Sequence, residues 1–304
     1  MNKQAQEYLQ MMTDLNKPRG LGIDVGLKTR LHKGQIDALS CLYDDSDVLT
    51  LFLACGRKFG KTEAVGYILW RHALENPGSA CYYVGPQKDH ARKLLWDNRR
   101  IQRYLENDSD KYIDRIENDT MTIRFKNGSY IQILGSDNYA VANGLTPSIA
   151  VYDEFKHFRE IWHTEFSPNR AALGAKLIVI GTKPRPENRN YKQYEALLNF
   201  YKNDPRGKLI EKTTFDNPIN TMPAQAAAIQ VEIDQLRQDD QEDVVQLEYY
   251  SKVIPGGKRA IFPMLDPEKH RITRQRMEEI IDEERDNLEF YCVADPRYNF
   301  TIIF

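Results

Sequence analysis

One segment of the sequence limits the possible folds more than any other. The apolar run Leu49–Ala54 leads directly into the residues CGRKFGKT at positions 55–62, and helix-forming residues continue to Glu75. A buried strand, a turn that ends in Gly-Lys-Thr and a helix, in this order, are typical of a phosphate-binding loop. The sequence therefore predicts an α/β fold organised around a bound phosphate group.

Each part of this loop has an expected role. Gly60 permits the backbone turn that directs amide groups at phosphate oxygens, Lys61 reaches the terminal phosphates and the Thr62 hydroxyl binds Mg²⁺. Cys55 departs from the usual glycine at the first position, which is tolerable if its φ is negative. The alternative is a chance Gly-Lys-Thr at an ordinary turn between a strand and a helix. The residues expected to contact the nucleotide are Gly56, Arg57, Lys58, Phe59, Gly60, Lys61 and Thr62.

Two adjacent acids follow another apolar run. Residues 148–152 read as a buried strand, and Asp153 and Glu154 come directly after it. A phosphate-binding loop that hydrolyses its nucleotide needs one carboxylate near the metal and one that orients the attacking water. We expect Asp153 in the first role and Glu154 in the second; alone, the pair could equally cap a strand end.

Two further polar residues stand near strand ends. Thr182 follows the apolar run Leu177–Ile180 and could contact the γ-phosphate or its water, or it could belong to an ordinary turn. Gln35 precedes the first strand, and its carboxamide could pair with both the amino group and N7 of adenine. A single glutamine is more often a surface residue.

The remaining pattern alternates helices and strands and then becomes helical. Helices are expected at 33–43, 61–75 and 87–103, and strands at 48–54, 80–84, 120–125, 129–134, 148–152 and 175–180. This order predicts a mainly parallel sheet flanked by helices, with an antiparallel hairpin at the turn 126–128. Residues 217–250 read as helices, and two strands are expected at 290–294 and 300–304.

Composition excludes several classes of protein. The formal net charge of −2 gives no overall basic field for binding nucleic acid. The four cysteines form no Cys-x-x-Cys pair, which indicates reduced thiols. No signal peptide and no membrane-spanning run are found, so we expect a soluble protein that makes no contact with a membrane.

Together these motifs resemble the large terminase subunit of tailed bacteriophages, the ATPase that packages DNA, from about Gln35 to Pro296. The loop of that family often reads G-R-x-x-G-K-T, as it does here. The resemblance implies a P-loop NTPase fold of the ASCE, RecA-like type, with ATP and Mg²⁺ as cofactors. It also implies roles for three groups of residues: Arg57, Lys61 and Glu154 in catalysis, Thr182 in coupling, and Gln35 in adenine binding.

The resemblance also implies domains and partners. The expected domains are an N-terminal arm at 1–32, an ATPase core at 33–215, a helical linker or lid at 216–285 and the start of an RNase H-like nuclease at 286–304. The expected partners are double-stranded DNA, the portal protein of a procapsid and the small terminase subunit, in the cytoplasm of the bacterial host. A homo-oligomeric ring is expected on the portal, and a monomer is expected in solution.

Two departures from the family are informative. Asp295 resembles the first nuclease carboxylate, but the sequence ends at Phe304 before the others, so nuclease activity is not expected. Asn143 stands where many relatives carry an arginine that acts on the neighbouring subunit, with Arg159 and Arg170 as weak substitutes. Without such an arginine, ATP hydrolysis by the isolated chain should be slower by about 10³ or more.

Other functions remain open from the sequence. One alternative is a different P-loop DNA translocase or helicase-like ATPase, and another is a nucleotide-gated interaction module without turnover. The basic stretches 88–103 and 183–192 are candidates for DNA contact, although the first could equally be a solvated helix face.

Overall fold

The computed structural model describes residues 31–44, 47–97, 109–185, 188–253, 292–295 and 300–303. The chain divides into two units, Met1–Ile254 and Pro255–Phe304, which are described separately. Residues 1–30 of the expected arm at 1–32 and residues 254–285 of the expected linker lie outside the described residues, as do the side chains of the second unit.

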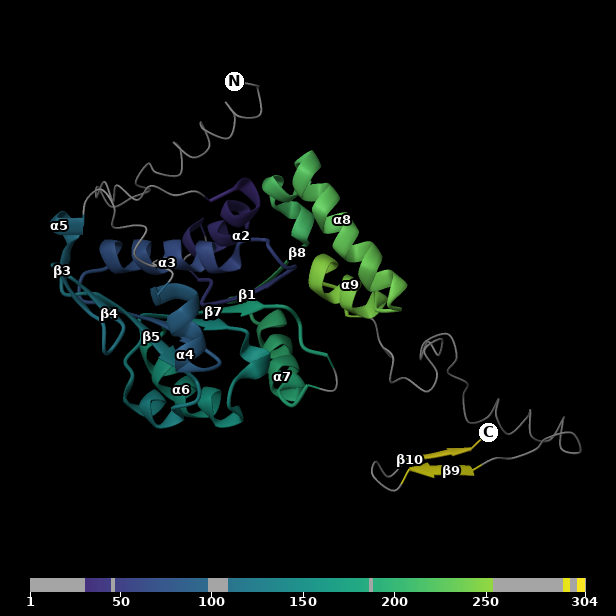
Figure 1. The fold of residues 1–304 in the computed structure, drawn as a ribbon. Coiled ribbons are helices and arrows are strands. Elements are labelled where there is room, and N and C mark those ends of the chain that lie inside the picture. Colours follow the sequence, from purple (N-terminus) through teal and green to yellow (C-terminus); the bar gives the residue numbers. More distant parts are fainter. Residues whose placement is uncertain are drawn as a thin grey trace, which may run out of the picture. The chain divides into compact units, whose positions relative to one another are not determined.

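A mixed sheet forms the centre of the first unit (Figure 1). In the described residues it has eight strands in the order β3-β4-β5-β2-β6-β7-β1-β8. The strands from β5 to β8 run parallel, whereas β3 and β4 add antiparallel at one edge. The strands are β1 (Thr50–Cys55), β2 (Ala80–Gly85), β3 (Ile113–Glu117), β4 (Thr122–Phe125), β5 (Tyr130–Gly135), β6 (Ile149–Asp153), β7 (Lys176–Gly181) and β8 (Gly207–Lys212).

Helices cover both faces of this sheet. Figure 1 shows α2 and α3 over one face, α6 and α7 over the other, and the pair α8 and α9 beside β8. Short turns, labelled η, connect several elements. The helices are α2 (Lys33–Asp44), α3 (Lys61–Glu75), α4 (Lys88–Ala91), α5 (Ser109–Tyr112), α6 (Glu160–Leu173), α7 (Tyr191–Lys202), α8 (Pro223–Gln238) and α9 (Glu242–Tyr250); the turns are η1 (Arg92–Asp97), η3 (Tyr139–Gly144), η4 (Phe155–His157), η5 (Thr214–Asp216) and η6 (Pro218–Thr221).

The central strands are apolar on both sides because both faces of the sheet are covered. In β1, Leu51 and Leu53 belong to the core on the α3 side, and Phe52 belongs to the core on the α6 side. The strands β6 and β7 alternate in the same way. Continuous apolar runs in the sequence therefore become two separate cores, one on each face.

Most of the predicted elements are confirmed. The predicted helices at 33–43 and 61–75 correspond to α2 and α3, the predicted strands correspond to β1, β2, β4, β5, β6 and β7, and β4 and β5 form the expected hairpin. The predicted helix at 87–103 is wrong in part, because α4 is short and continues as the π-helical turn η1; residues 98–103 lie outside the described residues.

Five helices and strands were not predicted, namely α5, β3, α6, α7 and β8. The strand β8 extends the sheet beyond β1, and its residues are half-buried or exposed, so its sequence lacks the apolar run of a central strand. No element is therefore predicted from the sequence at residues 207–212, where the structure has a strand.

The helical region at 217–250 is confirmed as α8 and α9, which share a small core of Ile229, Ile233, Val245 and Tyr249. In the second unit, β9 (Cys292–Asp295) pairs antiparallel with β10 (Phe300–Ile303) as expected. Among the described residues, no helix combines the length and the hydrophobicity that crossing a bilayer requires.

Candidate nucleotide-binding site

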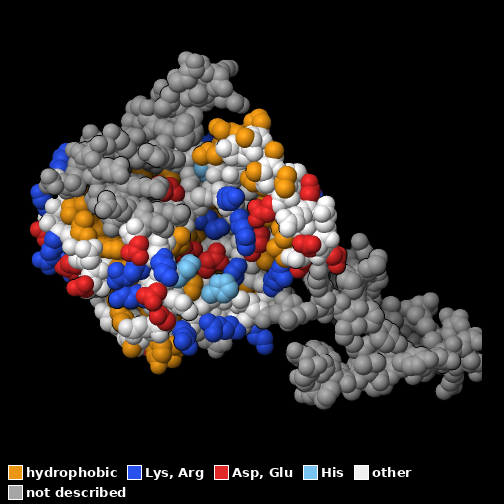
Figure 2. Space-filling view, viewed as in Figure 1, with side chains coloured by type: hydrophobic (Ala, Val, Ile, Leu, Met, Phe, Trp, Pro, Cys, Tyr) orange, Lys and Arg blue, Asp and Glu red, His pale blue; other side chains and the backbone are white. Residues whose placement is uncertain are grey.

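Three neighbouring strands end at the same level of the sheet. Asp153 on β6 pairs with Ile180 on β7, and Gly181 on β7 pairs with Ala54 on β1. The loop after β1, the acids at the end of β6 and Thr182 after β7 therefore emerge close together, where ligands bind in open α/β sheets. Figure 2 shows acidic, basic and histidine side chains gathered over the middle of the molecule, between α8 and the α4 segment.

The loop ends at an uncapped helix. Gly60 is the N-cap of α3, its φ of 98° lies in the left-handed region, and it makes no side-chain cap hydrogen bond. The first amides of α3 have no acceptor within the helix, and they lie at the positive end of its dipole. An anion at this position would take the place of the missing cap. Cys55 stays in β1 and is absent from the residues of positive φ, as its sequence position requires.

Side chains from other segments hold the backbone carbonyls of the loop. Thr214 Oγ1 donates to Arg57 O at 2.7 Å. The Nδ2 atoms of Asn217 and Asn220 donate to Lys58 O at 2.9 and 3.1 Å. These three side chains come from η5, η6 and the residue between them.

The segment before β1 holds the next two carbonyls. Gln35 Nε2 donates to Gly60 O at 2.7 Å, and His32 Nε2 lies 2.8 Å from Phe59 O. Because His32 Nδ1 accepts from the Gln35 amide, Nε2 is the protonated nitrogen and donates to Phe59 O. Burial lowers the pKa of His32, which favours this neutral form. With every carbonyl from 57 to 60 hydrogen-bonded to a side chain outside the loop, the loop is preorganised.

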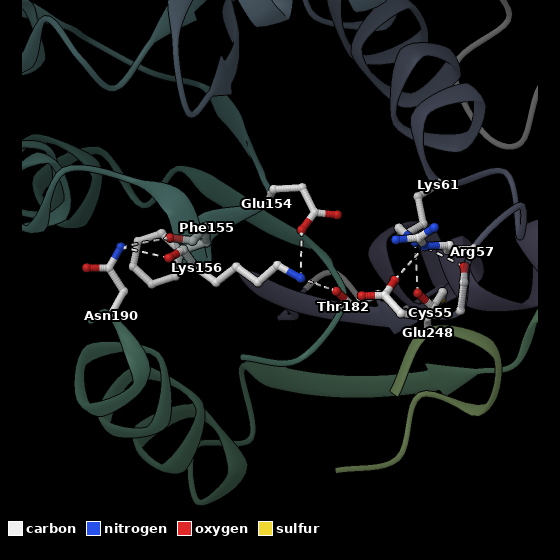
Figure 3. Close-up of polar contacts among 10 residues, drawn as sticks. Cys55, Arg57, Lys61, Glu154, Phe155, Lys156, Thr182, Asn190 and Glu248 are labelled. Carbon is white, nitrogen blue, oxygen red and sulfur yellow. Dashed lines mark hydrogen bonds and ion pairs between the residues drawn. The ribbon is translucent and has the colours of Figure 1, made fainter. Parts of the chain in front are cut away.

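Lys61 lies folded back over the start of the loop. Its Nζ donates to Cys55 O at 2.8 Å and to Gly56 O at 3.1 Å (Figure 3). Both acceptors are neutral carbonyls, so neither of them competes as a counterion with an anion that binds Lys61. Burial raises the pKa of the Cys55 thiol to about 12, so this cysteine is a neutral side chain of the core.

Arg57 is exposed and points at α9. Its Nε donates to Glu248 Oε2 at 2.9 Å, and its amide donates to Glu248 O at 2.6 Å. A Cβ on the preceding Gly56 would lie 2.7 Å from backbone atoms of Thr214 and Tyr249, so only glycine permits this approach. The start of the loop is therefore packed against α9 and η5.

Asp153 is the buried acid of the site. Its Oδ2 accepts a hydrogen bond from Tyr83 OH, on the neighbouring strand β2. Burial raises the pKa of Asp153 to about 6, the Tyr83 hydrogen bond opposes this, and the nearby charges of Glu154 and Lys61 raise and lower it respectively. A buried carboxyl with a perturbed pKa at the end of a central strand is typical of a functional site.

Glu154 is connected to Thr182 through the side chain of Lys156. Its backbone is left-handed, with φ 53°, and its amide donates to Ile180 O at 2.9 Å. Its Oε2 lies 3.3 Å from Lys156 Nζ, which also donates to Thr182 Oγ1 (Figure 3). The structure thus brings together Asp153, Glu154 and Thr182, as expected.

Several site residues were not predicted from the sequence. They are the supporting side chains His32, Tyr83, Lys156, Asn190, Thr214, Asn217, Asn220 and Glu248. Most contact backbone atoms far away in the sequence, so no local pattern identifies them. Lys156 is the exception, since a basic residue directly after the acid pair could have been noticed.

The basic loop at 183–192 is engaged within the molecule. Lys183 pairs with Glu211, Arg185 pairs with Asp243 at 3.0 Å, and Arg189 donates to the last carbonyl of η4 and to the next one. Arg170 is buried and donates to Thr50 and Tyr201, so the suggestion that it acts on a neighbouring subunit is wrong. Arg159 is exposed.

No protein-family model and no curated protein sequence matches this chain. Solved structures do match it. The large terminase of bacteriophage HK97 superposes with a TM-score of 0.62 and 15% identity, over 81% of this chain and 56% of its own. The large terminase of a thermophilic bacteriophage, in complex with ADP, gives 0.54 and 18%, over 79% and 57%.

A third match is to an isolated domain. The ATPase domain of the Thermus phage P74-26 large terminase superposes with a TM-score of 0.54 and 15% identity, over 75% of this chain and 96% of that domain. This chain thus spans little more than half of the whole terminases but nearly all of the ATPase domain. It therefore has the fold of phage large terminase ATPase domains, the P-loop fold of the ASCE class.

Proposed function

We propose that this chain binds Mg²⁺ and ATP at residues 56–62 and hydrolyses ATP as the motor subunit of a viral DNA-packaging terminase. The observation that carries the proposal is the loop whose carbonyls are held outward by five side chains, beside the acids of β6. The amides of Gly56, Arg57 and Phe59 already donate to backbone carbonyls, so the amides at the start of α3 are the ones available to phosphate oxygens. ATP-γ-S and ADP are bound in structures of the matched terminase from a thermophilic bacteriophage, which supports the same ligand here.

The donor groups fit a magnesium nucleotide. Lys61 supplies a positive charge, Thr62 a hydroxyl in the first turn of α3, and Asp153 a buried carboxylate that an added cation would stabilise in its ionised form. Bound Mg²⁺ would neutralise charge on the phosphates and help to orient them. Thr62 and Asp153 are the residues we assign to this cation, Asp153 acting through its hydration shell.

The remaining roles follow from position. Glu154 would accept a hydrogen bond from the attacking water, since its carboxylate is partly exposed beside the loop. Arg57 would leave Glu248 to contact the γ-phosphate, and Thr182 would report the state of the site to β7. Gln35 is 2% exposed and already uses one amide hydrogen on Gly60 O and one lone pair on the His32 amide, so it would have to turn outward to contact adenine.

DNA packaging is supported by the fold of the matched ATPase domains. We assign residues 33–215 to the ATPase core and 216–285 to a lid or linker, with an arm at 1–32. Residues 286–304 would begin a nuclease domain, with Asp295 as its first acid. The proposed partners are double-stranded DNA, a portal-bearing procapsid, the small terminase subunit and further copies of this chain in a ring, in the host cytoplasm.

Steady-state ATP hydrolysis tests the proposal directly. The wild-type chain should hydrolyse ATP slowly with Mg²⁺, and faster with linear double-stranded DNA and a portal-bearing procapsid. Lys61→Ala should abolish both binding and turnover, because the loop loses the ammonium assigned to the terminal phosphates.

Glu154→Gln distinguishes an ATPase from a nucleotide-gated interaction module. An ATPase loses turnover in this variant and keeps its affinity for ATP, because Gln is a poor base of similar shape. A module that only binds nucleotide would be unaffected. Wild-type turnover no higher than that of Lys61→Ala would contradict the proposal.

A further inference from the structure

Lys156 is a largely buried cation with no role in the function assigned above. It lies in η4, the turn that follows Glu154, and only 13% of its side chain is exposed. Burial of an ammonium is costly unless charged or hydrogen-bonding groups compensate for the lost water. The partners of Lys156 therefore indicate its role.

The ammonium of Lys156 links the segments that follow β6 and β7. Nζ lies 3.3 Å from Glu154 Oε2 at the end of β6 and donates to Thr182 Oγ1 at the end of β7, as Figure 3 shows. Thr182 is 6% exposed, so this contact is shielded from water. One cation thus connects the acid assigned to the attacking water with the threonine assigned to coupling.

The backbone that carries Lys156 is fixed. Asn190 Nδ2 donates to Lys156 O at 3.2 Å and to Phe158 O at 2.7 Å. The rings of Phe155 and Phe158 are buried against Tyr152, with centroids 5.5 and 5.1 Å from its ring. A side chain that starts from such a turn reaches the same place each time.

The Glu154 carboxylate also packs closely against Gly181. A Cβ on Gly181 would lie 3.2 Å from Glu154 Oε2 and 3.3 Å from its Cδ, and Gly181 has a φ of 144°. The carboxylate therefore lies against the backbone of Gly181, while Lys156 forms an ion pair with one of its oxygens. Its other oxygen, Oε1, has no such restraint from the ammonium.

We propose that Lys156 is a positioning residue: it holds Glu154 by Oε2, leaves Oε1 to accept a hydrogen bond from the attacking water, and ties this orientation to Thr182. The inference rests on the proposed ATPase function. It explains why a cation lies beside a carboxylate that has to act as a base, because fixing one oxygen orients the other.

Lys156→Met tests the inference, because methionine keeps the long apolar stem without the charge. We expect kcat to fall by about 10- to 100-fold, the size of effect that misplacing a reacting group produces. KM for ATP should stay near the wild-type value, because Lys156 is assigned to the base and not to the phosphates. Lys156→Arg keeps a cation and should recover part of kcat.

Thr182 provides the second arm of the test. Thr182→Val removes the hydroxyl and should lower kcat, whereas Thr182→Ser should retain it. If Lys156 acts through this contact, the double variant Lys156→Met with Thr182→Val should lose much less than the product of the two single losses. Lys202→Met, an exposed position at the end of α7, is the matched control and should leave turnover unchanged.

The outcomes separate this inference from the ATPase proposal. If the wild type turns over ATP and Lys156→Met matches or exceeds it, the positioning role is wrong and the ATPase stands. If the wild type does not exceed Lys61→Ala, the ATPase proposal is wrong and this inference falls with it. Should Lys156→Met fail to fold, the comparison of Thr182→Val with Thr182→Ser decides, and equal kcat values for that pair would overturn the inference.

Discussion

Gly181 is a single residue on which the position of the proposed base depends. Its φ of 144° is unfavourable for other residues, and the Glu154 carboxylate lies directly against it. We expect Gly181→Ala to displace Glu154 and to lower kcat by about tenfold or more, with a small change in ATP affinity. Steady-state kinetics and binding of a fluorescent ATP analogue would measure the two effects.

Gly174 offers the matched control for this substitution. It also has a positive φ, 60°, at the end of α6, but a Cβ there meets nothing within 4 Å. Gly174→Ala should therefore lower stability through backbone strain alone and leave kcat unchanged. Equal losses of kcat in both variants would show that strain, and not displacement of Glu154, is responsible.

Asp153 gives the stability of the chain a dependence on pH. Burial raises its pKa to about 6 in the folded chain from an ordinary value of 3.8, so the folded chain binds this proton more tightly than the unfolded chain. The free energy of unfolding therefore falls as the pH rises from about 4 to about 6, and this contribution is then constant.

Asp153→Asn removes that loss, since asparagine does not ionise and its Oδ1 can still accept from Tyr83. We expect the variant to be more stable than the wild type by about 1 to 3 kcal/mol at pH 8, and the difference to shrink below pH 6. Urea unfolding without nucleotide at both pH values measures it. Asp119→Asn, an exposed position, should show no such difference, and a gain in Asp153→Asn that is independent of pH would refute the explanation.

At the scale of elements, the turns η5 and η6 act as a support for the phosphate loop. Asn217 and Asn220 both donate to Lys58 O, and both are buried. Asn220→Asp replaces a donor with an acceptor that repels this carbonyl, so the loop should lose its fixed shape. We expect affinity for ADP to fall by about 10-fold, equivalent to about 1.4 kcal/mol, measured by calorimetry.

Asn199→Asp is the matched control on the exposed side of α7, and it should bind ADP like the wild type. If Asn220→Asp also bound ADP normally, the hydrogen bonds to Lys58 O would be dispensable. The loop would then be shaped by its own residues.

Elements with strong local patterns were predictable, and supporting contacts were not. The strand, loop and helix from Thr50 to Glu75 follow from adjacent residues, because an apolar run, glycines and helix formers each act locally. The strand β8 is defined by its pairing with β1, and its own sequence alternates too weakly to show it.

The same distinction applies to the site. Lys61, Asp153 and Glu154 could be predicted, because each stands directly after an apolar run or within the Gly-Lys-Thr motif. His32 and Thr214 reach carbonyls at Phe59 and Arg57 across the fold, so only the tertiary structure reveals them. Sequence patterns identify the groups that meet the ligand, whereas the groups that shape the backbone depend on packing.

For the first unit as a whole, ligand binding should raise the unfolding temperature. A nucleotide at 100 times its Kd stabilises the folded state by about 2.7 kcal/mol, which corresponds to about 4 to 5 °C for a chain of this size. We expect this shift with Mg²⁺ and ATP-γ-S in differential scanning fluorimetry. Lys61→Ala should show no shift, while Lys202→Ala should shift like the wild type; a full shift in Lys61→Ala would place the ligand elsewhere.

The contact between α9 and the start of the loop has a consequence for synthesis on the ribosome. Arg57 and Ala54 leave the ribosome long before Glu248 and Ser251, which bind the Arg57 amide and the Ala54 carbonyl. While α9 is still inside the ribosome, the nascent chain therefore has a complete Gly-Lys-Thr motif that lacks its contacts with α9. Competence to hold nucleotide should arise late in translation, when the last helix of this unit closes onto a loop made near its beginning.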